Sequence, residues 1–216
     1  MHQAAEKETH MLQLFYDGGP FMWPLLISLL LGLAVAFERL WALTRASINT
    51  RKFLQQIKIA LREEGITAAQ ELCANTRGPV AAIFHAGLMR VDRGLEHVEK
   101  AIENAGTIEM SFLEKGLVWL ATIANIAPML GFLGTVSGMI GAFTAIAEAG
   151  DIEPSIVASG ISEALITTAS GLAIAIPIQA FHNYFVSRID RLIIDMEESA
   201  NDLIDFLVEM EMEKTA

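Results

Sequence analysis

The chain has 216 residues, 53% of them hydrophobic, and carries a formal net charge of −11. Most of the apolar residues fall in three blocks, at about 21–37, 117–146 and 156–185. Each block is long enough to cross about 30 Å of hydrocarbon as a helix. The blocks lack the alternating polar faces that a soluble helical bundle needs, so we expect a membrane protein rather than that alternative. The acidic balance argues against a nucleic-acid partner.

The first apolar block follows a segment with a single basic residue, Lys7. A signal peptide would need a basic start and a small-residue cleavage site, so a retained helix fits better. We expect a periplasmic segment at 1–20, with a short amphipathic helix to about Phe15, and a first transmembrane helix at 21–43. Trp23 and Trp41 lie near its two ends, where aromatic residues mark membrane interfaces.

Basic residues predict the orientation. Fourteen of the fifteen Lys and Arg lie at Arg39 or beyond, and none lies between 116 and 187. The positive-inside rule therefore predicts a periplasmic N-terminus, a cytoplasmic helical domain at 44–115 and a short periplasmic loop at 148–155. Within 44–115 we expect a helix that ends near Gly65, a turn at 76–79, and a helix from about Leu95 that runs unbroken into the second span. Cys73 is the only cysteine, which suits a reducing compartment.

The second and third transmembrane helices are expected at 116–147 and 156–187, and a cytoplasmic acidic helical tail at 188–216. Apolar residues in the tail are spaced by alternating fours and threes, which is a heptad seam. Two interpretations remain: the tail packs on its own chain, or it packs against neighbouring copies. The seam consists of Ile189, Ile193, Met196, Ala200, Leu203, Leu207 and Met210.

Glu163 is the only formal charge inside the third apolar block. Placing a charge in the bilayer costs roughly 2.5–3.5 kcal/mol, so the residue needs a function, and ion or proton paths are the usual one. A structural hydrogen bond between helices is the alternative; neither the second nor the third span offers a Lys or Arg to pair with it. Thr135 and Thr168 would extend a polar lining along an ion path. Further candidates are Thr167, Ser159 and Ser170, although such hydroxyls often bond only to their own helix.

Small residues recur at helical spacing in both spans, and small stripes let membrane helices approach closely. We therefore expect the two spans to pack against one another within one subunit. The glycines that would mediate this packing are Gly131, Gly138, Gly160 and Gly171.

Catalytic signatures are missing from the sequence. It has no HExxH, GxSxG or phosphate-loop motif, and its five histidines show no ligand spacing. We expect neither an enzyme nor a metal or cofactor site.

Two segments, GFLGTVSGMIGAF and GISEALITTASGLAIAIP, resemble the signatures of the MotA/TolQ/ExbB family. The pair Glu38-Arg39 and the segment GPVAAIFHAGL resemble the same family. Three spans and a modest loop are similar to ExbB and TolQ, whereas MotA-type subunits have four spans. On these motifs, Thr135, Glu163 and Thr168 match the family's polar residues in spans two and three.

The resemblance implies an all-α membrane protein that assembles as a homopentameric ring. The ring would surround two copies of an ExbD- or TolR-like single-span partner, whose aspartate carries the proton. It implies a proton-channel subunit of a motor in the inner membrane of a Gram-negative bacterium, coupled to outer-envelope transport or maintenance through a TonB- or TolA-like protein. The alternative is a non-conducting scaffold for a membrane complex.

Overall fold

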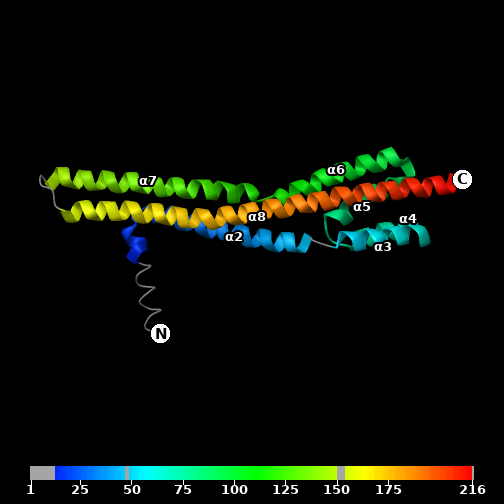
Figure 1. The fold of residues 1–216 in the computed structure, drawn as a ribbon, viewed down its shortest axis with the longest axis horizontal. Coiled ribbons are helices and arrows are strands. Elements are labelled where there is room, and N and C mark those ends of the chain that lie inside the picture. Colours follow the sequence, from blue (N-terminus) through cyan, green and yellow to red (C-terminus); the bar gives the residue numbers. More distant parts are fainter. Residues whose placement is uncertain (1–12, 47–48, 150–153, 216) are drawn as a thin grey trace, which may run out of the picture. The chain divides into compact units, whose positions relative to one another are not determined.

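The computed structural model describes residues 13–46, 49–149 and 154–215. Throughout these ranges the regular secondary structure is helical, which confirms the all-α prediction. Residues 13–17 form a helical segment. Residues 1–12 of the predicted periplasmic segment and residues 150–153 of the loop predicted at 148–155 lie outside the described residues. The elements that follow are α2 (Met22–Ala46), α3 (Thr50–Glu63), α4 (Ile66–Asn75), α5 (Pro79–Leu88), the 3-10 turn η1 (Val91–Arg93), α6 (Leu95–Glu114), α7 (Leu117–Ala149) and α8 (Pro154–Thr215) (Figure 1).

Three helical segments, centred on α2, α7 and α8, are long and apolar enough to cross a membrane. Only 22–33% of the residues in their most apolar windows are buried inside the chain. Large side chains such as Phe132, Phe143 and Ile176 are more than half exposed. A soluble monomer does not leave so much contiguous apolar surface in water, so lipid or other protein chains must cover it. The chain is therefore a membrane protein.

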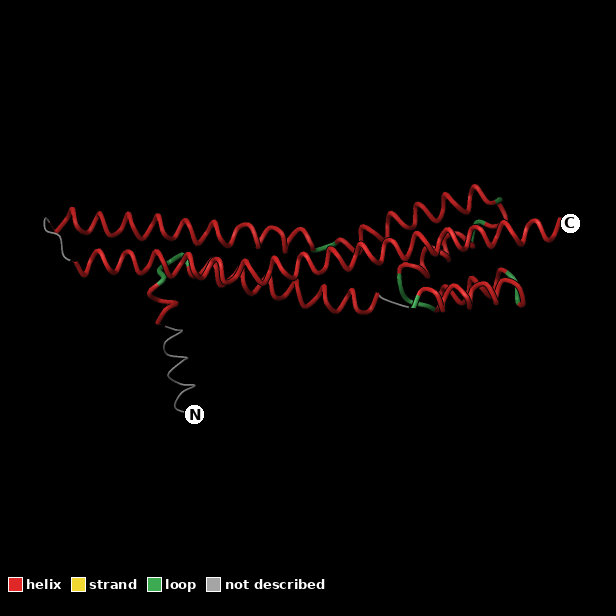
Figure 2. The backbone as a smooth tube through the Cα atoms, in the orientation of Figure 1, coloured by secondary structure: helices red, strands yellow, loops and turns green. Residues whose placement is uncertain are grey.

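One expectation about the helices is wrong. The helix from Leu95 does not run unbroken into the second span, because α6 ends at Glu114 and α7 begins at Leu117. Gly116 adopts φ +89°, a left-handed conformation that interrupts a helix and suits glycine. Figure 2 shows the break as a short loop. The Arg39 Nη1 donates to the carbonyl oxygens of Phe112 and Leu113, at 3.5 and 3.4 Å, which satisfies acceptors that the end of α6 leaves open.

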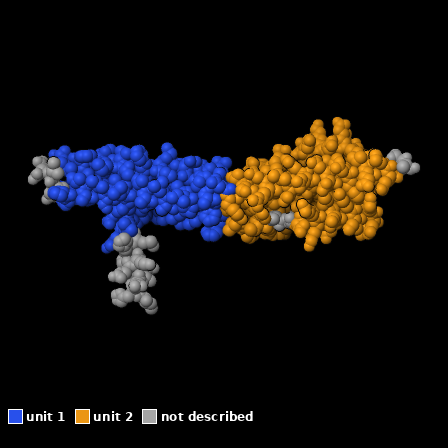
Figure 3. All heavy atoms as spheres, in the orientation of Figure 1, with its two compact units in different colours: residues 1–38, 116–183 blue, residues 39–115, 184–216 orange. Residues whose placement is uncertain are grey.

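The chain divides into two compact units (Figure 3). Unit 1 comprises 1–38 and 116–183, and unit 2 comprises 39–115 and 184–216. Unit 1 therefore holds the three apolar segments, and unit 2 holds α3 to α6 with the C-terminal part of α8. Each unit has its own way of packing.

Large apolar side chains fill the interior of unit 2. Phe53 stacks on Phe84 with ring centroids 5.8 Å apart and planes 15° from parallel. Phe84, Ile57 and Val98 are fully buried. The helix α3 buries an apolar face at Phe53, Ile57 and Leu61. It ends where the sequence predicts, just before Gly65, which has φ +92°.

The acidic tail is the C-terminal part of α8, and α8 continues without a break from the third span. Its heptad residues Ile189, Met196 and Leu203 are buried within the isolated chain. Lys58 and Arg62 of α3 each lie 5.3 Å from the centre of the Phe206 ring. These contacts confirm the interpretation that the tail packs on its own chain, and they use most of the apolar seam that a contact with neighbouring copies would need.

Candidate functional site

The candidate site is built on the contact between α7 and α8, where glycines bring backbone against backbone. A Cβ added at Gly138 would lie 3.0 Å from the Gly160 carbonyl oxygen, and one added at Gly160 would lie 2.9 Å from the Gly138 oxygen. A Cβ added at Gly171 would lie 2.6 Å from the Ala127 carbonyl oxygen, and one added at Gly131 would lie 2.9 Å from the Thr167 carbonyl oxygen. No side chain larger than hydrogen fits these positions without moving a helix.

These contacts fix an antiparallel register for the two helices. Ala142 lies against Gly160, and Ala127 lies against Gly171 at the other end of the contact. Between them, Gly134 lies against the Thr167 side chain. The sequence prediction names Gly131 and Gly138 for this contact and misses Gly134. The signal that could have found it is the spacing of three and four through Gly131, Gly134 and Gly138.

The first apolar segment packs on the same pair of helices. A Cβ added at Gly32 of α2 would lie 2.6 Å from Ile178 Cδ1 of α8 and 3.5 Å from Ile123 Cγ2 of α7. Before α2, Gly18 lies close to Ile166, to which an added Cβ would be 3.0 Å away. Unit 1 is thus a three-helix membrane unit whose contacts are made at glycines in all three segments.

Glu163 is half-buried on α8, and its side chain lies against the turn that precedes α2. A Cβ added at Gly19 would come within 2.8 Å of the carboxyl carbon of Glu163 and overlap one carboxylate oxygen. Gly19 has φ +68°, so the turn already favours glycine for its backbone. The carboxyl group therefore lies at the start of the first apolar segment, a contact that no local sequence pattern predicted.

The two neighbouring threonines have different surroundings. Thr168 Oγ1 donates a hydrogen bond to the Gly131 carbonyl oxygen at 3.1 Å, which joins α8 to α7. Thr167 is completely buried, and its Oγ1 lies 3.0 Å from the carbonyl oxygens of both Glu163 and Ala164. Thr167 thus contributes to the contact between the helices and presents no hydroxyl at the surface of the chain.

The remaining polar candidates lie nearer the surface. Thr135 is half-buried, and its Oγ1 donates to the Phe132 oxygen of its own helix at 2.6 Å. Ser159 is exposed and Ser170 is half-buried. The structure therefore brings Thr167 and Thr168 to α7 and places Glu163 at the turn before α2, while Thr135 bonds within its own helix.

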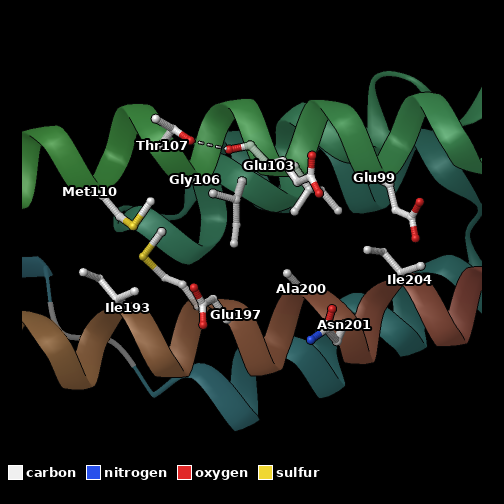
Figure 4. Close-up of a pocket in the computed structure, with 13 residues that line it drawn as sticks. Glu99, Glu103, Gly106, Thr107, Met110, Ile193, Glu197, Ala200, Asn201 and Ile204 are labelled. Carbon is white, nitrogen blue, oxygen red and sulfur yellow. Dashed lines mark hydrogen bonds between the residues drawn. The ribbon is translucent and has the colours of Figure 1, made fainter.

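Unit 2 contains a groove of about 660 Å³ between α6 and the C-terminal part of α8. Figure 4 shows Glu99 and Glu103 of α6 on one side of the groove and Glu197 and Asn201 of α8 on the other, with Met110 and Ile193 at one end. Among the described residues, no group of three or more His, Cys, Asp or Glu could hold a metal ion.

Cys73 offers no reactive thiol either. It is buried in unit 2, and burial raises the pKa of its thiol to about 12. Only the thiolate is nucleophilic, so this cysteine is a small core residue.

Comparison with known proteins assigns the chain to a family. The family model of the MotA/TolQ/ExbB proton channel family matches residues 75–198, more than half of the chain. The chain belongs to this family. The matched range includes the whole contact between α7 and α8, together with Glu163, Thr135 and Thr168.

The names of individual relatives refer to biopolymer transport and to the Tol-Pal system. The chain is 33% identical over 180 residues to a putative biopolymer transport protein ExbB homolog of Methanothermobacter thermautotrophicus, covering 83% of this chain and 64% of that protein. It is 40% identical over 111 residues to the biopolymer transport protein ExbB of Xanthomonas campestris, a match that covers 51% of this chain and 44% of that protein. It is 39% identical over 102 residues to the Tol-Pal system protein TolQ of Pseudomonas aeruginosa, a match that covers 47% of this chain and 44% of that protein. The chain thus spans less than two thirds of the length of these relatives.

Proposed function

We propose that this protein is an ion-conducting subunit of an inner-membrane motor that works with a single-span ExbD- or TolR-like partner. The observation that carries the proposal is Glu163, the only formal charge in the third apolar block and a member of the range matched by the family model. A carboxyl group at this depth can bind and release a proton, and such residues mark ion pathways in membrane proteins.

The packing of α7 on α8 supports this function because it makes a rigid hairpin. Two helices in contact through their backbones cannot slide or rotate without a clash, so the polar groups that they carry keep fixed positions. Thr168 adds a hydrogen bond between the helices at the same level. Fixed polar groups of this kind can line a path along which a partner's carboxyl group gains and loses its proton.

The outward faces of α7 and α8 support an assembly. They expose large apolar side chains, including Phe132, Ile140 and Ile176. In our proposal five copies form a ring, two partner helices occupy its lumen, and lipid covers the rest. The N-terminus is periplasmic and the C-terminus cytoplasmic, as the distribution of Lys and Arg predicts.

The energy source would be the membrane potential. One elementary charge that crosses the membrane releases about 2.3 kcal/mol per 100 mV. We propose that this energy drives movement between the ring and the partner helices and reaches an outer-envelope process. The printed names of the relatives, biopolymer transport protein and Tol-Pal system protein, suggest the class of process.

One observation favours a second candidate, a non-conducting scaffold. Glu163 lies against the turn at Gly19, so its carboxyl group can act as a contact that holds the first apolar segment on α8. In that case Glu163 would stabilise the assembled protein, and no ion pathway would be needed to explain a carboxyl group in the third apolar block.

The test is proton flux through vesicles that contain the chain together with its partner subunit. Glu163→Gln and Glu163→Ala should each lower the flux per assembled complex by at least about tenfold, since general proton-transfer roles are worth that much or more. Glu148→Gln is the matched control, because Glu148 is an exposed glutamate near the end of α7. If Glu163 serves only assembly, its variants should lower the yield of complex and leave the flux per complex unchanged, and that result would overturn its role in conduction. Background flux from the wild-type complex would favour the non-conducting scaffold and overturn the channel proposal.

A further inference from the structure

Unit 2 has a second cavity, of about 560 Å³, that the proposed function does not use. It is bounded by the last turn of α2, the turn between α4 and α5, the first two turns of α5, and the end of α6. Its charged lining consists of Arg45, Arg77 and Glu109, with His85 beside them. Two guanidinium groups against one carboxylate leave the lining net positive by one, with His85 neutral.

The two arginines remain available to a ligand. Arg77 is exposed and forms no ion pair with any described residue. Arg45 lies over the Trp41 ring with its guanidinium carbon 5.2 Å from the ring centre. Stacking of this kind orients the guanidinium plane and leaves its N–H edges free to donate. Both side chains can therefore present paired donors to oxygen atoms in the cavity.

The start of α5 adds further positive potential. Its N-cap residue is Gly78, which has no side chain to accept a hydrogen bond from the first amides, and Pro79 occupies the first turn. Unpaired amides and the helix dipole make the start of a helix favourable for an anion. Gly78 and Pro79 both line the cavity, so this potential acts together with that of the arginines.

The position of the cavity identifies the environment of the ligand. Arg45 comes eight residues after the first apolar block, in the last turn of α2. Trp41 on α2 and Phe112 on α6 are 64% and 62% exposed. Exposed aromatic rings beside an arginine at the end of a span are typical of the headgroup level of a membrane. The cavity therefore combines cationic donors with an adjoining apolar surface at the height of a lipid headgroup.

We propose that this cavity binds the phosphate of an anionic phospholipid headgroup from the leaflet next to unit 2. Arg45 and Arg77 would each donate paired hydrogen bonds to phosphate oxygens, a geometry for which the guanidinium group is suited. The acyl chains would lie against the exposed rings of Trp41 and Phe112. Basic pockets at the ends of membrane helices recognise lipid headgroups in this manner. The proposal stands independently of ion conduction.

Native mass spectrometry of the full chain tests this site, with the protein taken from micelles that contain equal amounts of phosphatidylglycerol and phosphatidylcholine. The wild-type chain should retain phosphatidylglycerol in preference, by roughly thirtyfold, since the two arginines contribute about 1 kcal/mol each near an anionic lipid. The double variant R45Q/R77Q should lose this preference. R90Q/R93Q is the matched control, because it removes the same charge from exposed arginines that do not line the cavity.

A second variant keeps both arginines. Ala82→Trp fills the cavity, which Ala82 lines, and should lower retention of phosphatidylglycerol as much as R45Q/R77Q does. If R45Q/R77Q does not fold, Ala82→Trp still tests whether the cavity binds the lipid. Equal retention of phosphatidylglycerol by all variants would overturn the proposal. Inorganic phosphate is the last arm: if it displaces the lipid headgroup as well as free phosphatidylglycerol does, the site binds free phosphate and the lipid assignment is wrong.

Discussion

The two units hold their helices together by opposite means. In unit 1, α7 and α8 meet where side chains are missing, at Gly131, Gly138, Gly160 and Gly171. In unit 2, the helices meet through large side chains, of which Phe84 is fully buried. Lipid chains are as apolar as leucine, so helices in a membrane gain little by burying large residues and depend on close approach instead. In water, burial of apolar area supplies the stability.

This comparison predicts that unit 2 is most sensitive to loss of volume. Phe84→Ala removes a ring that is completely buried and stacked on Phe53. We expect a loss of about 3–5 kcal/mol in the free energy of unfolding, from lost burial and the cavity left behind. Thermal or denaturant unfolding followed by circular dichroism would measure it. Met89→Ala is the control, because Met89 is 56% exposed, and an equal loss in both variants would contradict the account of unit 2.

Unit 1 should be most sensitive to added volume. Gly160→Leu would drive a side chain into the Gly138 carbonyl oxygen and Ala142. Overpacking of this kind costs about 1–3 kcal/mol where neighbours can yield, and here backbone must move, so we expect the upper end of that range. Heat-induced unfolding in detergent would report the change. Gly141→Leu provides the comparison, since an added Cβ there meets nothing within 4 Å. Equal tolerance of both substitutions would show that the helices are not in close contact.

A smaller change would measure how much the hydrogen bond between the helices contributes to stability, apart from the contribution of their packing. Thr168→Val keeps the shape of the side chain and removes the hydroxyl that donates to the Gly131 oxygen. Such bonds in membranes contribute about 0.6–1 kcal/mol, so the melting temperature should fall slightly. Thr144→Val is matched to it, because the Thr144 hydroxyl donates only to the Ile140 oxygen of its own helix. A larger effect at Thr144 would contradict a structural role for the bond at Thr168.

The smallest expected effect is a dependence of unit 2 on pH. Burial raises the pKa of the Glu109 carboxyl group above its ordinary value of 4.5. The folded chain therefore keeps this proton to higher pH than the unfolded chain does, so the contribution of Glu109 to stability declines as pH rises through that interval. Glu109→Gln should remove this decline, and its advantage over wild type should increase with pH and then level off. Parallel melting curves of wild type and Glu109→Gln across this pH range would measure the effect, and an advantage that does not change with pH would contradict it.

Much of this arrangement follows from local sequence patterns. Apolar blocks of sufficient length predict the three membrane helices, and the apolar face with Gly65 predicts α3 and its end. The recurrence of glycine and alanine predicts that α7 and α8 approach closely, although it does not say whether Gly134 or its neighbour Thr135 faces the partner helix. One residue changes the direction on a helix by about 100°, so an approximate stripe leaves that choice open.

Other features depend on contacts between distant parts of the chain. The contact between Glu163 and the turn at Gly19 is one of them, since it joins residues 144 positions apart. The break at Gly116 is different, because Lys115 followed by glycine is a local signal for the end of a helix that the prediction of an unbroken helix did not use. The heptad pattern of the tail was correct as a helical face, yet spacing alone does not distinguish a seam between copies from burial on the same chain.

Partner dependence of conduction tests the central claim most directly. Vesicles with this chain alone, with its single-span partner alone, and with both should be compared for proton flux at equal protein content under an imposed potential. The account predicts a flux near background for either protein alone and at least about tenfold more for the two together, because each contributes part of the path. Background flux from the assembled pair, or full flux from this chain alone, would contradict it.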